Sequence, residues 1–371
     1  MRGNDVLGII FANAGDEALS EVTGFRSMAS VPFGGGYRLI DFVLSSMVNA
    51  GMKKIGVLTN NNYQSLMDHL GSGKPWDLAR KKEGLFLLPP FNAEEIENYN
   101  ASRIGALKNI LKFLEKSNEE YVLLSDCTAV ANFDFADVFE QFSKSGADIM
   151  MLYKQGAVPR LKELTVIERI EDGRITKLVM ADGAKKGAYG LKITIMKKSL
   201  LQRLIGESFA KGNSSFEKDI LVKNIKKLNI CGYEVKGFCC VLDSLKSYFD
   251  ANFALLAPEN YDELFNMERP VCTKVYEDMP AVYGLGSSVK NSLVADGCVI
   301  EGRGENSILF RDCRVEKDAE VKNCVLLPHT FVAEAARLGY CITDKAVAVR
   351  SGKVLSGADT YPVYIGKGIH I

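Results

Sequence analysis

The 371-residue sequence lacks several features that would place it in common protein classes. It has one tryptophan, three histidines and nine cysteines, and the cysteines show neither CxxC spacing nor paired histidine ligands. This pattern argues against a structural zinc site and favours a reducing, cytoplasmic setting. Lys and Arg together number 46, as do Asp and Glu, so no net charge recruits nucleic acid or an anionic membrane. We expect no signal peptide and no membrane span, because no apolar run is long enough.

The composition is that of a folded protein with a large core. Hydrophobic residues make up 47% of the chain, and its length suffices for two or more domains. The adjacent pair Cys239 and Cys240 lies in an apolar run, where buried packing is favoured over redox chemistry.

The N-terminal segment has the pattern of a parallel α/β sheet. Residues 6–12 form a short apolar run bounded by turn formers, which predicts a strand buried on both faces. Residues 37–51 have apolar positions three and four apart and end at Gly51, which predicts a helix. Residues 54–59 predict the next buried strand. A strand, helix and strand at this spacing indicate a right-handed crossover, with ligands at the carboxyl ends of the strands.

The C-terminal segment follows a different pattern. From Tyr283 onward, small apolar residues recur about six apart, and Gly, Asn and Asp occupy the turns. These are hexapeptide repeats, which predict a left-handed parallel β-helix. A repeat solenoid must cover its ends by capping or by pairing, so we expect oligomerisation. The apolar series is Leu293, Val299, Leu309, Val315, Val321 and Leu327.

Three short segments carry a resemblance to a known family. Residues 32–38 read Pro-Phe-Gly-Gly-Gly-Tyr-Arg, residues 73–78 read Gly-Lys-Pro-Trp-Asp-Leu, and residues 87–90 read Leu-Leu-Pro-Pro. They resemble bacterial glucose-1-phosphate adenylyltransferase, the enzyme that makes ADP-glucose for glycogen, and the resemblance covers almost the whole chain. It implies an α/β fold: a Rossmann-like, mostly parallel nucleotidyltransferase domain followed by a left-handed β-helix.

The phosphate-binding loop departs from that family. Its pattern is roughly Leu-Ala-Gly-Gly-x-Gly-x-Arg-Leu, because backbone N–H groups must approach the phosphates and an arginine balances the charge of the leaving pyrophosphate. A gapless match from residues 32–38 places the paired glycines on Asn13 and Ala14 and the arginine on Ala18. The residues that flank the loop are retained, whereas the positive charge of the family arginine is lost.

The positions where the family binds magnesium and the sugar phosphate also carry different residues in this sequence. The first metal aspartate falls on Thr128 in a gapless match, and Asp126 takes that place only with a local deletion. The second falls on Val241, with Asp243 displaced by two residues, and the sugar-phosphate lysine falls on Ala181. Each loss should cost catalysis several kcal/mol.

The helix that faces the nucleotide in the family opens here at residues 101–105, where Arg103 is a bulky cation. A chain that retains the scaffold segments but lacks the residues that bind phosphate, metal and sugar phosphate resembles the non-catalytic, GlgD-type subunits. The resemblance implies a nucleotidyltransferase-like domain with a degraded site at 1–256, a connector at 257–280, and an oligomerising, regulatory β-helix at 281–371. It also implies a catalytic adenylyltransferase subunit as partner in a hetero-tetramer, with no cofactor of its own and Mg²⁺ in the partner.

Arg26 and Arg38 are the basic residues left in the N-terminal stretch. In the family this stretch contributes to a site for phosphorylated effectors near the β-helix, and guanidinium groups suit phosphate geometry. The resemblance therefore marks Arg26 and Arg38 as candidate ligands of a sugar-phosphate effector. The alternative is that Arg38 caps or pairs at a helix start.

Two other functions stay open. One is an active nucleotidyltransferase with a remodelled magnesium site built from Asp126, Asp134 or Asp243. The other is a stand-alone sugar-phosphate sensor or acyltransferase on the β-helix. Some hexapeptide-repeat acyltransferases use a histidine base, but His329 follows a Leu-Pro pair at a turn, which favours a structural or surface role.

Overall fold

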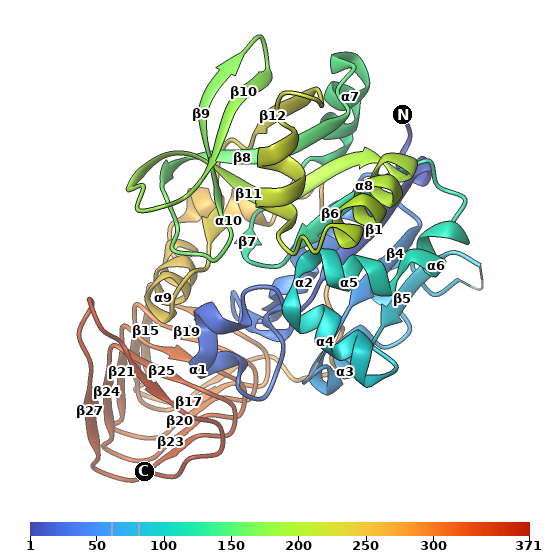
Figure 1. The fold of residues 1–371 in the computed structure, drawn as a ribbon. Coiled ribbons are helices and arrows are strands. Elements are labelled where there is room, and N and C mark those ends of the chain that lie inside the picture. Colours follow the sequence, from blue (N-terminus) through green and yellow to red (C-terminus); the bar gives the residue numbers. More distant parts are fainter. Residues whose placement is uncertain (61, 81) are drawn as a thin grey trace.

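The computed structural model describes residues 1–60, 62–80 and 82–371. They form an α/β domain followed by a β-helix of three parallel sheets (Figure 1). The predicted fold class, a mostly parallel α/β domain with a C-terminal left-handed β-helix, is confirmed. In this described part of the chain, no helix has the length and apolar character needed to cross a bilayer.

A nine-stranded sheet is the centre of the α/β domain, with the order β5-β4-β1-β6-β11-β8-β12-β10-β9. β1 pairs in parallel with β4 and β6, whereas β11 runs antiparallel to β6 and β8. The carboxyl ends of β4, β1 and β6 therefore meet at one edge. The strands are β1 Val6–Phe11, β4 Lys54–Leu58, β5 Gly84–Leu88, β6 Tyr121–Asp126, β8 Ile149–Ala157, β9 Thr165–Glu171, β10 Arg174–Met180, β11 Lys186–Lys197 and β12 Ile230–Glu234.

Helices cover both faces of this sheet. α2 and α7 contribute to one buried cluster, and α5 and α8 contribute to a second. Two short antiparallel pairs, β2 Pro32–Phe33 with β3 Tyr37–Arg38 and β7 Ala129–Val130 with β13 Cys240–Val241, lie outside the sheet. The helices are α1 Ser20–Thr23, α2 Leu39–Asn49, α3 Gln64–Leu70, α4 Ala93–Ala101, α5 Arg103–Asn109, α6 Leu111–Glu115, α7 Phe135–Ser145, α8 Lys198–Ala210, α9 Leu245–Ala254 and α10 Pro258–Leu264, with a π-helix at Phe216–Val222.

The strand β1 supplies both clusters, as its sequence predicted. Val6 and Ile10 pack in the first cluster, and Leu7, Ile9 and Phe11 pack in the second. This division follows from the alternation of side chains along a strand, and every residue of β1 is buried.

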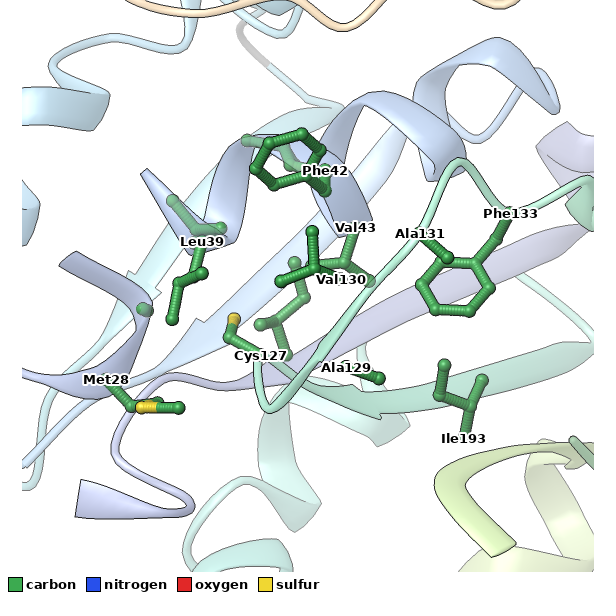
Figure 2. Close-up of a cluster of buried hydrophobic side chains, with 14 of the residues drawn as sticks. Met28, Leu39, Phe42, Val43, Cys127, Ala129, Val130, Ala131, Phe133 and Ile193 are labelled. Carbon is green, nitrogen blue, oxygen red and sulfur yellow. The ribbon is translucent and has the colours of Figure 1, made fainter. Parts of the chain in front are cut away.

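The first cluster joins α2 to the segment after β6. Figure 2 shows Phe42 and Val43 of α2 together with Val130 and Phe133 of that segment. This packing fixes the loop that follows Asp126 against the N-terminal stretch. The geometry of the strand ends is therefore set by apolar contacts rather than by the polar residues that lie there.

All three predicted N-terminal elements begin or end slightly differently in the structure, with β1 and β4 each one residue shorter than predicted. Tyr37 and Arg38 belong to β3 rather than to the helix, which begins at Leu39. The backbone N–H of Arg38 donates to Oδ2 of Asp41 at 2.9 Å, which caps the helix start. Gly51 has φ +84°, as expected of a glycine that ends a helix.

The β-helix consists of three five-stranded parallel sheets. One corner carries Asn291, Asn306, Asn323 and Tyr340, all at positive φ. Asparagine tolerates this conformation better than most residues, which explains its place in the repeat turns. The strands are β14 Val282–Tyr283, β15 Ser288–Lys290, β16 Leu293–Val294, β17 Val299–Ile300, β18 Arg303–Glu305, β19 Ile308–Leu309, β20 Arg314–Val315, β21 Glu320–Lys322, β22 Val325–Leu326, β23 Phe331–Val332, β24 Arg337–Gly339, β25 Cys341–Thr343, β26 Ala348–Val349, β27 Val354–Ser356 and β28 Val363–Ile365.

The predicted connector contains a short helix. α10 forms there, with Pro258 at its first turn, where no N–H donor is needed. Beyond α10 the chain runs along the α/β domain, where Thr273 Oγ1 donates to Asp41 Oδ2 at 2.6 Å. The nine cysteines are all free thiols, and burial raises the pKa of Cys239 to about 12 and of Cys240 to about 11.

Candidate functional site: the mouth and an interdomain pocket

The ends of β1, β4 and β6 open into a cleft of about 740 Å³, which we call the mouth. The chain leaves β1 toward β4 on one side and returns to β6 on the other, so the mouth lies at a topological switch point of the sheet. Ligands of α/β proteins bind at such points. The walls are the loop 13–18, the ends of β4 and β6, the start of α5, residues 160–163, Lys192 and Glu217.

Acidic groups mark the loop 13–18. Oδ1 of Asp16 accepts from the Met28 backbone N–H at 2.6 Å, and Oδ2 accepts from Asn13 Nδ2 at 2.8 Å. Burial is the main cause that raises the pKa of Asp16 to about 6. Ala18, at the place of the family arginine, lines the mouth without a charge. The loop therefore presents carboxyl groups where a polyphosphate would need cations.

Both candidate positions for the first metal aspartate lie in the mouth. Asp126 ends β6 and is fully buried, and its Oδ1 accepts from the backbone N–H of Thr128 at 3.2 Å and from its hydroxyl at 2.7 Å. Oδ2 has no hydrogen-bond partner among the described residues. Burial raises the pKa of Asp126, although the nearby cations Lys192 and Arg103 oppose that shift.

The other carboxylates considered for a magnesium site lie elsewhere. Oδ2 of Asp243 accepts from the Arg160 backbone N–H at 2.7 Å, and Asp134 pairs with Arg269 at 2.9 Å in the lining of a different pocket. Among the described residues, no three His, Cys, Asp or Glu side chains are grouped so as to hold a metal ion. Asp126, Asp134 and Asp243 therefore do not fit a shared magnesium site.

The remaining substituted positions lie outside the mouth lining. Val241 pairs with Ala129 between β13 and β7, and Ala181 packs against the core. Lys192 was missed from the sequence, although it is a single cation in an otherwise apolar run. It has φ +57°, and its Nζ donates to the carbonyl of Lys162 at 2.7 Å across the mouth.

Arg103 lies in the mouth with Glu217 of the π-helix. Its Nη1 donates to Glu217 Oε1 at 2.7 Å, and its Nη2 donates to the carbonyl of Lys192 at 2.9 Å. The two side chains are only 9% and 3% exposed. The sequence indicated that residues 101–105 had gained a bulky cation; the side chain of Ala101 in that segment lies outside the described residues.

A second site lies between the two domains. Its lining holds several basic residues together with Asp278, which pairs with Arg311 at 3.6 Å, and Asp312, which lies 3.4 Å from His329 Nδ1. This interdomain pocket has a volume of about 260 Å³. Arg38 lines it from the α/β domain and Tyr276 from the connector, while Arg311, His329 and Lys345 line it from the β-helix. Arg311 and Lys345 were missed from the sequence, because each occupies a repeat turn where charged residues are common, whereas His329 was noted there and given a structural or surface role.

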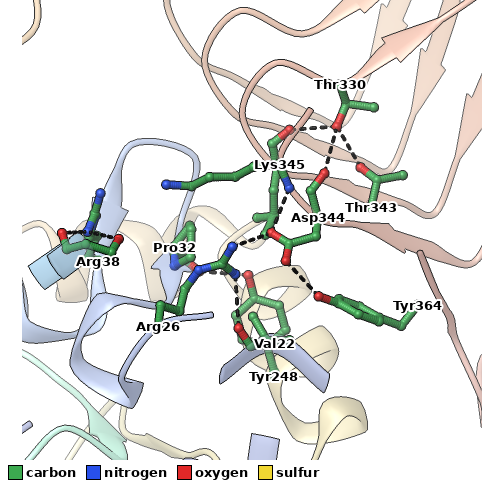
Figure 3. Close-up of polar contacts among 12 residues, drawn as sticks. Val22, Arg26, Pro32, Arg38, Tyr248, Thr330, Thr343, Asp344, Lys345 and Tyr364 are labelled. Atoms are coloured by element: carbon green, nitrogen blue, oxygen red, sulfur yellow. Dashed lines mark hydrogen bonds and ion pairs between the residues drawn. The ribbon is translucent and has the colours of Figure 1, made fainter. Parts of the chain in front are cut away.

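The two candidate effector arginines are placed differently. Arg26 does not line the interdomain pocket: its Nη2 pairs with Asp344 Oδ1 at 2.7 Å, and both side chains are buried (Figure 3). Arg38 lines the pocket wall, and its Nη1 donates to the carbonyl of Ser65 at 2.6 Å. Arg38 also stands at the start of α2, the place that the alternative role required.

Lys345 is the most perturbed cation of the interdomain pocket. Its side chain extends from the β-helix toward Arg38 (Figure 3). Burial, together with the positive charges of Arg38 and Arg26, lowers the pKa of Lys345 to about 7. Burial is also the main cause that lowers the pKa of Arg38. Desolvated cations that repel one another favour an anion between them.

Comparison with known proteins agrees with this architecture. Residues 8–191 match a family described as Nucleotidyl transferase, and residues 280–361 match GlmU-like, C-terminal hexapeptide. The chain is 34% identical over 370 residues to Glycogen biosynthesis protein GlgD of Bacillus subtilis (strain 168), covering 100% of this chain and 98% of that protein. The chain belongs to the GlgD family.

The chain is also similar to a second GlgD protein and to an enzyme. A GlgD protein of Geobacillus stearothermophilus is 34% identical over 86% of this chain and 83% of its own length. The glucose-1-phosphate adenylyltransferase of Clostridium perfringens (strain SM101 / Type A) is 28% identical over 90% of this chain and 87% of its own length. This GlgD-family chain is thus a nucleotidyltransferase-like protein related to glycogen biosynthesis.

Proposed function

We propose that the chain is a regulatory, non-catalytic subunit of glucose-1-phosphate adenylyltransferase. It would modulate the synthesis of ADP-glucose from ATP and glucose 1-phosphate by a catalytic partner subunit. The observation that carries this proposal is the mouth, which keeps the place of a nucleotide site but has the buried Arg103–Glu217 pair in its wall and bears no arginine at Ala18. The likeness to GlgD proteins and to adenylyltransferases supports the same role.

The charges of the loop 13–18 support a lack of catalysis, although Arg160, Lys162 and Lys192 supply cations elsewhere in the lining of the mouth. Asp16 and Glu17 stand on the loop that would meet the phosphates, and Ala18 supplies no cation there. Cations aimed at the leaving pyrophosphate are a large part of such catalysis, so each loss costs several kcal/mol of transition-state stabilisation. We expect the chain to need no cofactor of its own, with Mg²⁺ bound by the catalytic partner.

The β-helix supports association with that partner, as a hetero-tetramer. β14, β15 and β16 each pair with a neighbour on one side only, which leaves the first coil as an open edge. Met279, Val282, Tyr283 and Leu285 at or beside this coil are all more than half exposed. At the opposite end the chain itself covers β26, since Arg350 N–H donates to the carbonyl of Ile371 at 2.8 Å, whereas β27 and β28 also pair with a neighbour on one side only. An uncovered apolar edge favours binding of another chain.

The interdomain pocket supports regulation by a sugar phosphate. Arg38, Arg311 and Lys345 converge on it from two domains, and a phosphate would offset their mutual repulsion. Because the pocket joins the domains, an anion bound there would change how the β-helix sits on the α/β domain.

The decisive experiment compares this chain, a catalytic adenylyltransferase subunit, and the two co-expressed. ADP-glucose formation is measured for each, with and without sugar phosphates. We expect no product from this chain alone and altered turnover or effector response in the mixture. Identical kinetics of the catalytic subunit with and without this chain would contradict the proposal.

The effector site is tested within the same complex. Arg38→Ala should weaken activation by a sugar phosphate without changing assembly, since it removes a guanidinium from the pocket wall. Arg203→Ala, an exposed arginine of α8, is the matched control and should leave activation unchanged. Equal activation of the Arg38→Ala and unaltered complexes would refute an effector at this pocket.

One observation favours a second candidate, an active nucleotidyltransferase. Oδ2 of Asp126 is buried, without a partner among the described residues, and lies in the mouth. Such an oxygen is a possible first ligand for a metal once the mouth rearranges. Magnesium-dependent ADP-glucose synthesis by the isolated chain, abolished in Asp126→Asn, would establish this function in place of the regulatory one.

A further inference from the structure

Four of the nine cysteines form two thiol pairs inside the β-helix. The register of β17 with β20 places Cys298 beside Cys313, and the backbone N–H of Val299 donates to the carbonyl of Cys313 at 2.9 Å. The register of β22 with β25 likewise places Cys324 beside Cys341. Each thiol pair therefore joins two consecutive coils of the solenoid.

All four side chains lie in the apolar core of the β-helix, and each is 0% exposed. A hydrogen bond between the two thiols lowers the pKa of Cys298, whereas burial raises the pKa of Cys313 well above its ordinary value. The pKa of Cys341 is lowered and that of Cys324 is raised for the same two reasons. Each pair thus holds one thiol that ionises more readily and one that stays protonated.

The spacing of the coils decides what can join two such sulfurs. Neighbouring strands lie about 4.8 Å apart. A disulfide needs its Cβ atoms at about 3.8 Å and its sulfurs at about 2.05 Å, so it would pull the two coils together. A thiolate lies about 2.3 Å from a bound metal ion, so two sulfurs on opposite sides of one ion are about 4.6 Å apart. The coil spacing therefore fits a bridging ion better than a disulfide.

The number and kind of ligands select the ion. Among the described residues, no three His, Cys, Asp or Glu side chains are grouped so as to hold a metal ion, so a thiol pair lacks the four ligands that zinc takes. Sulfur ligands select copper(I), which accepts two ligands in a line. An apolar core favours a neutral site, and Cu⁺ with one thiolate and one thiol is neutral.

We propose that the two thiol pairs, Cys298 with Cys313 and Cys324 with Cys341, are two-coordinate sites for copper(I) in the core of the β-helix. Cu⁺ binds between the two sulfurs and displaces one proton to solvent, and the metal is neither oxidised nor reduced. The bound ion bridges consecutive coils, so it stabilises the folded β-helix. This inference does not rest on the regulatory role, and either can fail while the other stands.

The test titrates the full chain with Cu(I) in the absence of oxygen, in competition with the chromophoric copper(I) ligand bicinchoninate. Because the thiols are buried, the ion is added to the folded chain and, separately, during refolding. We expect about two equivalents of copper per chain, about one proton released for each, a higher unfolding temperature, and X-ray absorption with two sulfur neighbours. No copper retained against the competitor by either route would overturn the proposal.

The repeats themselves supply substitutions that the fold accepts. Val347 holds the place of Cys313 two coils further on, and Ser307 holds the place of Cys324 in the preceding coil. Cys313→Val and Cys324→Ser should therefore fold, and each should lose about one of the two equivalents of copper. The double variant Cys313→Val/Cys324→Ser should lose both.

Two control variants test whether the other thiols bind the ion. Cys127→Ala removes a buried thiol of the α/β domain, and Cys239→Ser/Cys240→Ser removes the adjacent pair outside the β-helix. Both controls should keep about two equivalents of copper. Copper binding that Cys313→Val/Cys324→Ser keeps in full, or that Cys239→Ser/Cys240→Ser loses, would place the ion outside the β-helix and contradict the assignment.

Discussion

The buried carboxyl of Asp16 couples stability to pH. Its pKa is raised to about 6 in the folded chain, so the fold favours the protonated form. The stabilisation is fully present below about pH 4 and is lost as the pH rises through 6. We expect Asp16→Asn, which cannot ionise, to be about 2 kcal/mol more stable than the unaltered chain at pH 7 and about 1 kcal/mol less stable at pH 4, where only the loss of a hydrogen bond remains. Urea unfolding across this range measures the difference.

The control for this prediction is Glu17→Gln, which removes an exposed carboxylate from the same loop. Comparison of the two variants separates the effect on stability of losing one negative charge from the effect of removing a buried group that titrates. Loss of the hydrogen bond from Asn13 Nδ2 to the carboxylate of Asp16 offsets part of the gain, by about 1 kcal/mol. A stability difference between Asp16→Asn and the unaltered chain that stays constant from pH 4 to pH 7 would contradict the role of burial.

Lys345 should make anion binding at the interdomain pocket depend on pH. With its pKa lowered to about 7, the ammonium is present at pH 6 and mostly lost at pH 8. Sulfate is a suitable probe because its own charge is constant across this range. We expect sulfate to bind about tenfold more weakly at pH 8 than at pH 6, since a neutral amine offers no ionic attraction.

Two variants assign that pH dependence to a group. Lys345→Met should bind sulfate weakly at both pH values, with a flat profile. His329→Gln removes the imidazole that lines the same pocket and should keep most of the dependence. A profile abolished by His329→Gln and kept by Lys345→Met would assign the titration to the histidine instead.

At the scale of the element, the corners of the β-helix hold residues in the left-handed conformation. Ala335 and Ala346 have φ of +58° and +57°, and both are exposed. An L-residue there costs about 1–2 kcal/mol, which exceeds the entropy that glycine loses on folding. We expect Ala335→Gly and Ala346→Gly each to stabilise the chain by about 0.5–1 kcal/mol, measured as a rise in the urea midpoint.

Ala358→Gly is the matched control, because Ala358 is exposed and has a negative φ. The same substitution should there destabilise by about 0.5–1 kcal/mol, since only the entropy term remains. Equal effects of glycine at all three positions would show that corner conformation does not set stability.

The periodicity of apolar residues predicted those elements well whose formation depends mainly on burying one apolar face. The strand at residues 6–12 and the hexapeptide repeats were predicted from the pattern of apolar residues, because apolar side chains recur wherever one face of an element is buried. The helix start at Leu39 was misplaced by two residues, since the choice between β3 and α2 depends on the capping bond from Arg38 to Asp41. Local caps of this kind are weak signals in a sequence.

The sites could be predicted only in part. A gapless match placed the family's loop arginine on Ala18, which lines the mouth, but it could not show that Arg103 pairs with Glu217 there, because Glu217 lies 114 residues further along the chain. The pocket around Lys345 was missed for the same reason: its members come from separate domains. The identities of charged residues are visible in a sequence, whereas their pairing across a fold is not.

At the scale of the whole molecule, one buried ion pair links the domains. Arg26 and Asp344 are 2% and 1% exposed, and their closest atoms are 2.7 Å apart. Asp344 Oδ2 also accepts from the Tyr364 hydroxyl at 2.8 Å, and Arg26 Nη1 donates to the carbonyl of Val22 at 3.1 Å (Figure 3). The pair therefore lies inside a polar network that fixes the β-helix against the N-terminal stretch.

We expect a double-mutant cycle to show strong coupling across this interface. Asp344→Ala should destabilise the chain by about 3–5 kcal/mol, because it leaves the Arg26 cation buried and unpaired. Arg26→Met/Asp344→Asn should cost less than the sum of its single changes, since it removes both charges. The exposed pair Arg169–Glu171 is the control and should couple by less than about 1 kcal/mol. Additive costs for Arg26 and Asp344 in urea unfolding would show that the domains are held by apolar packing instead.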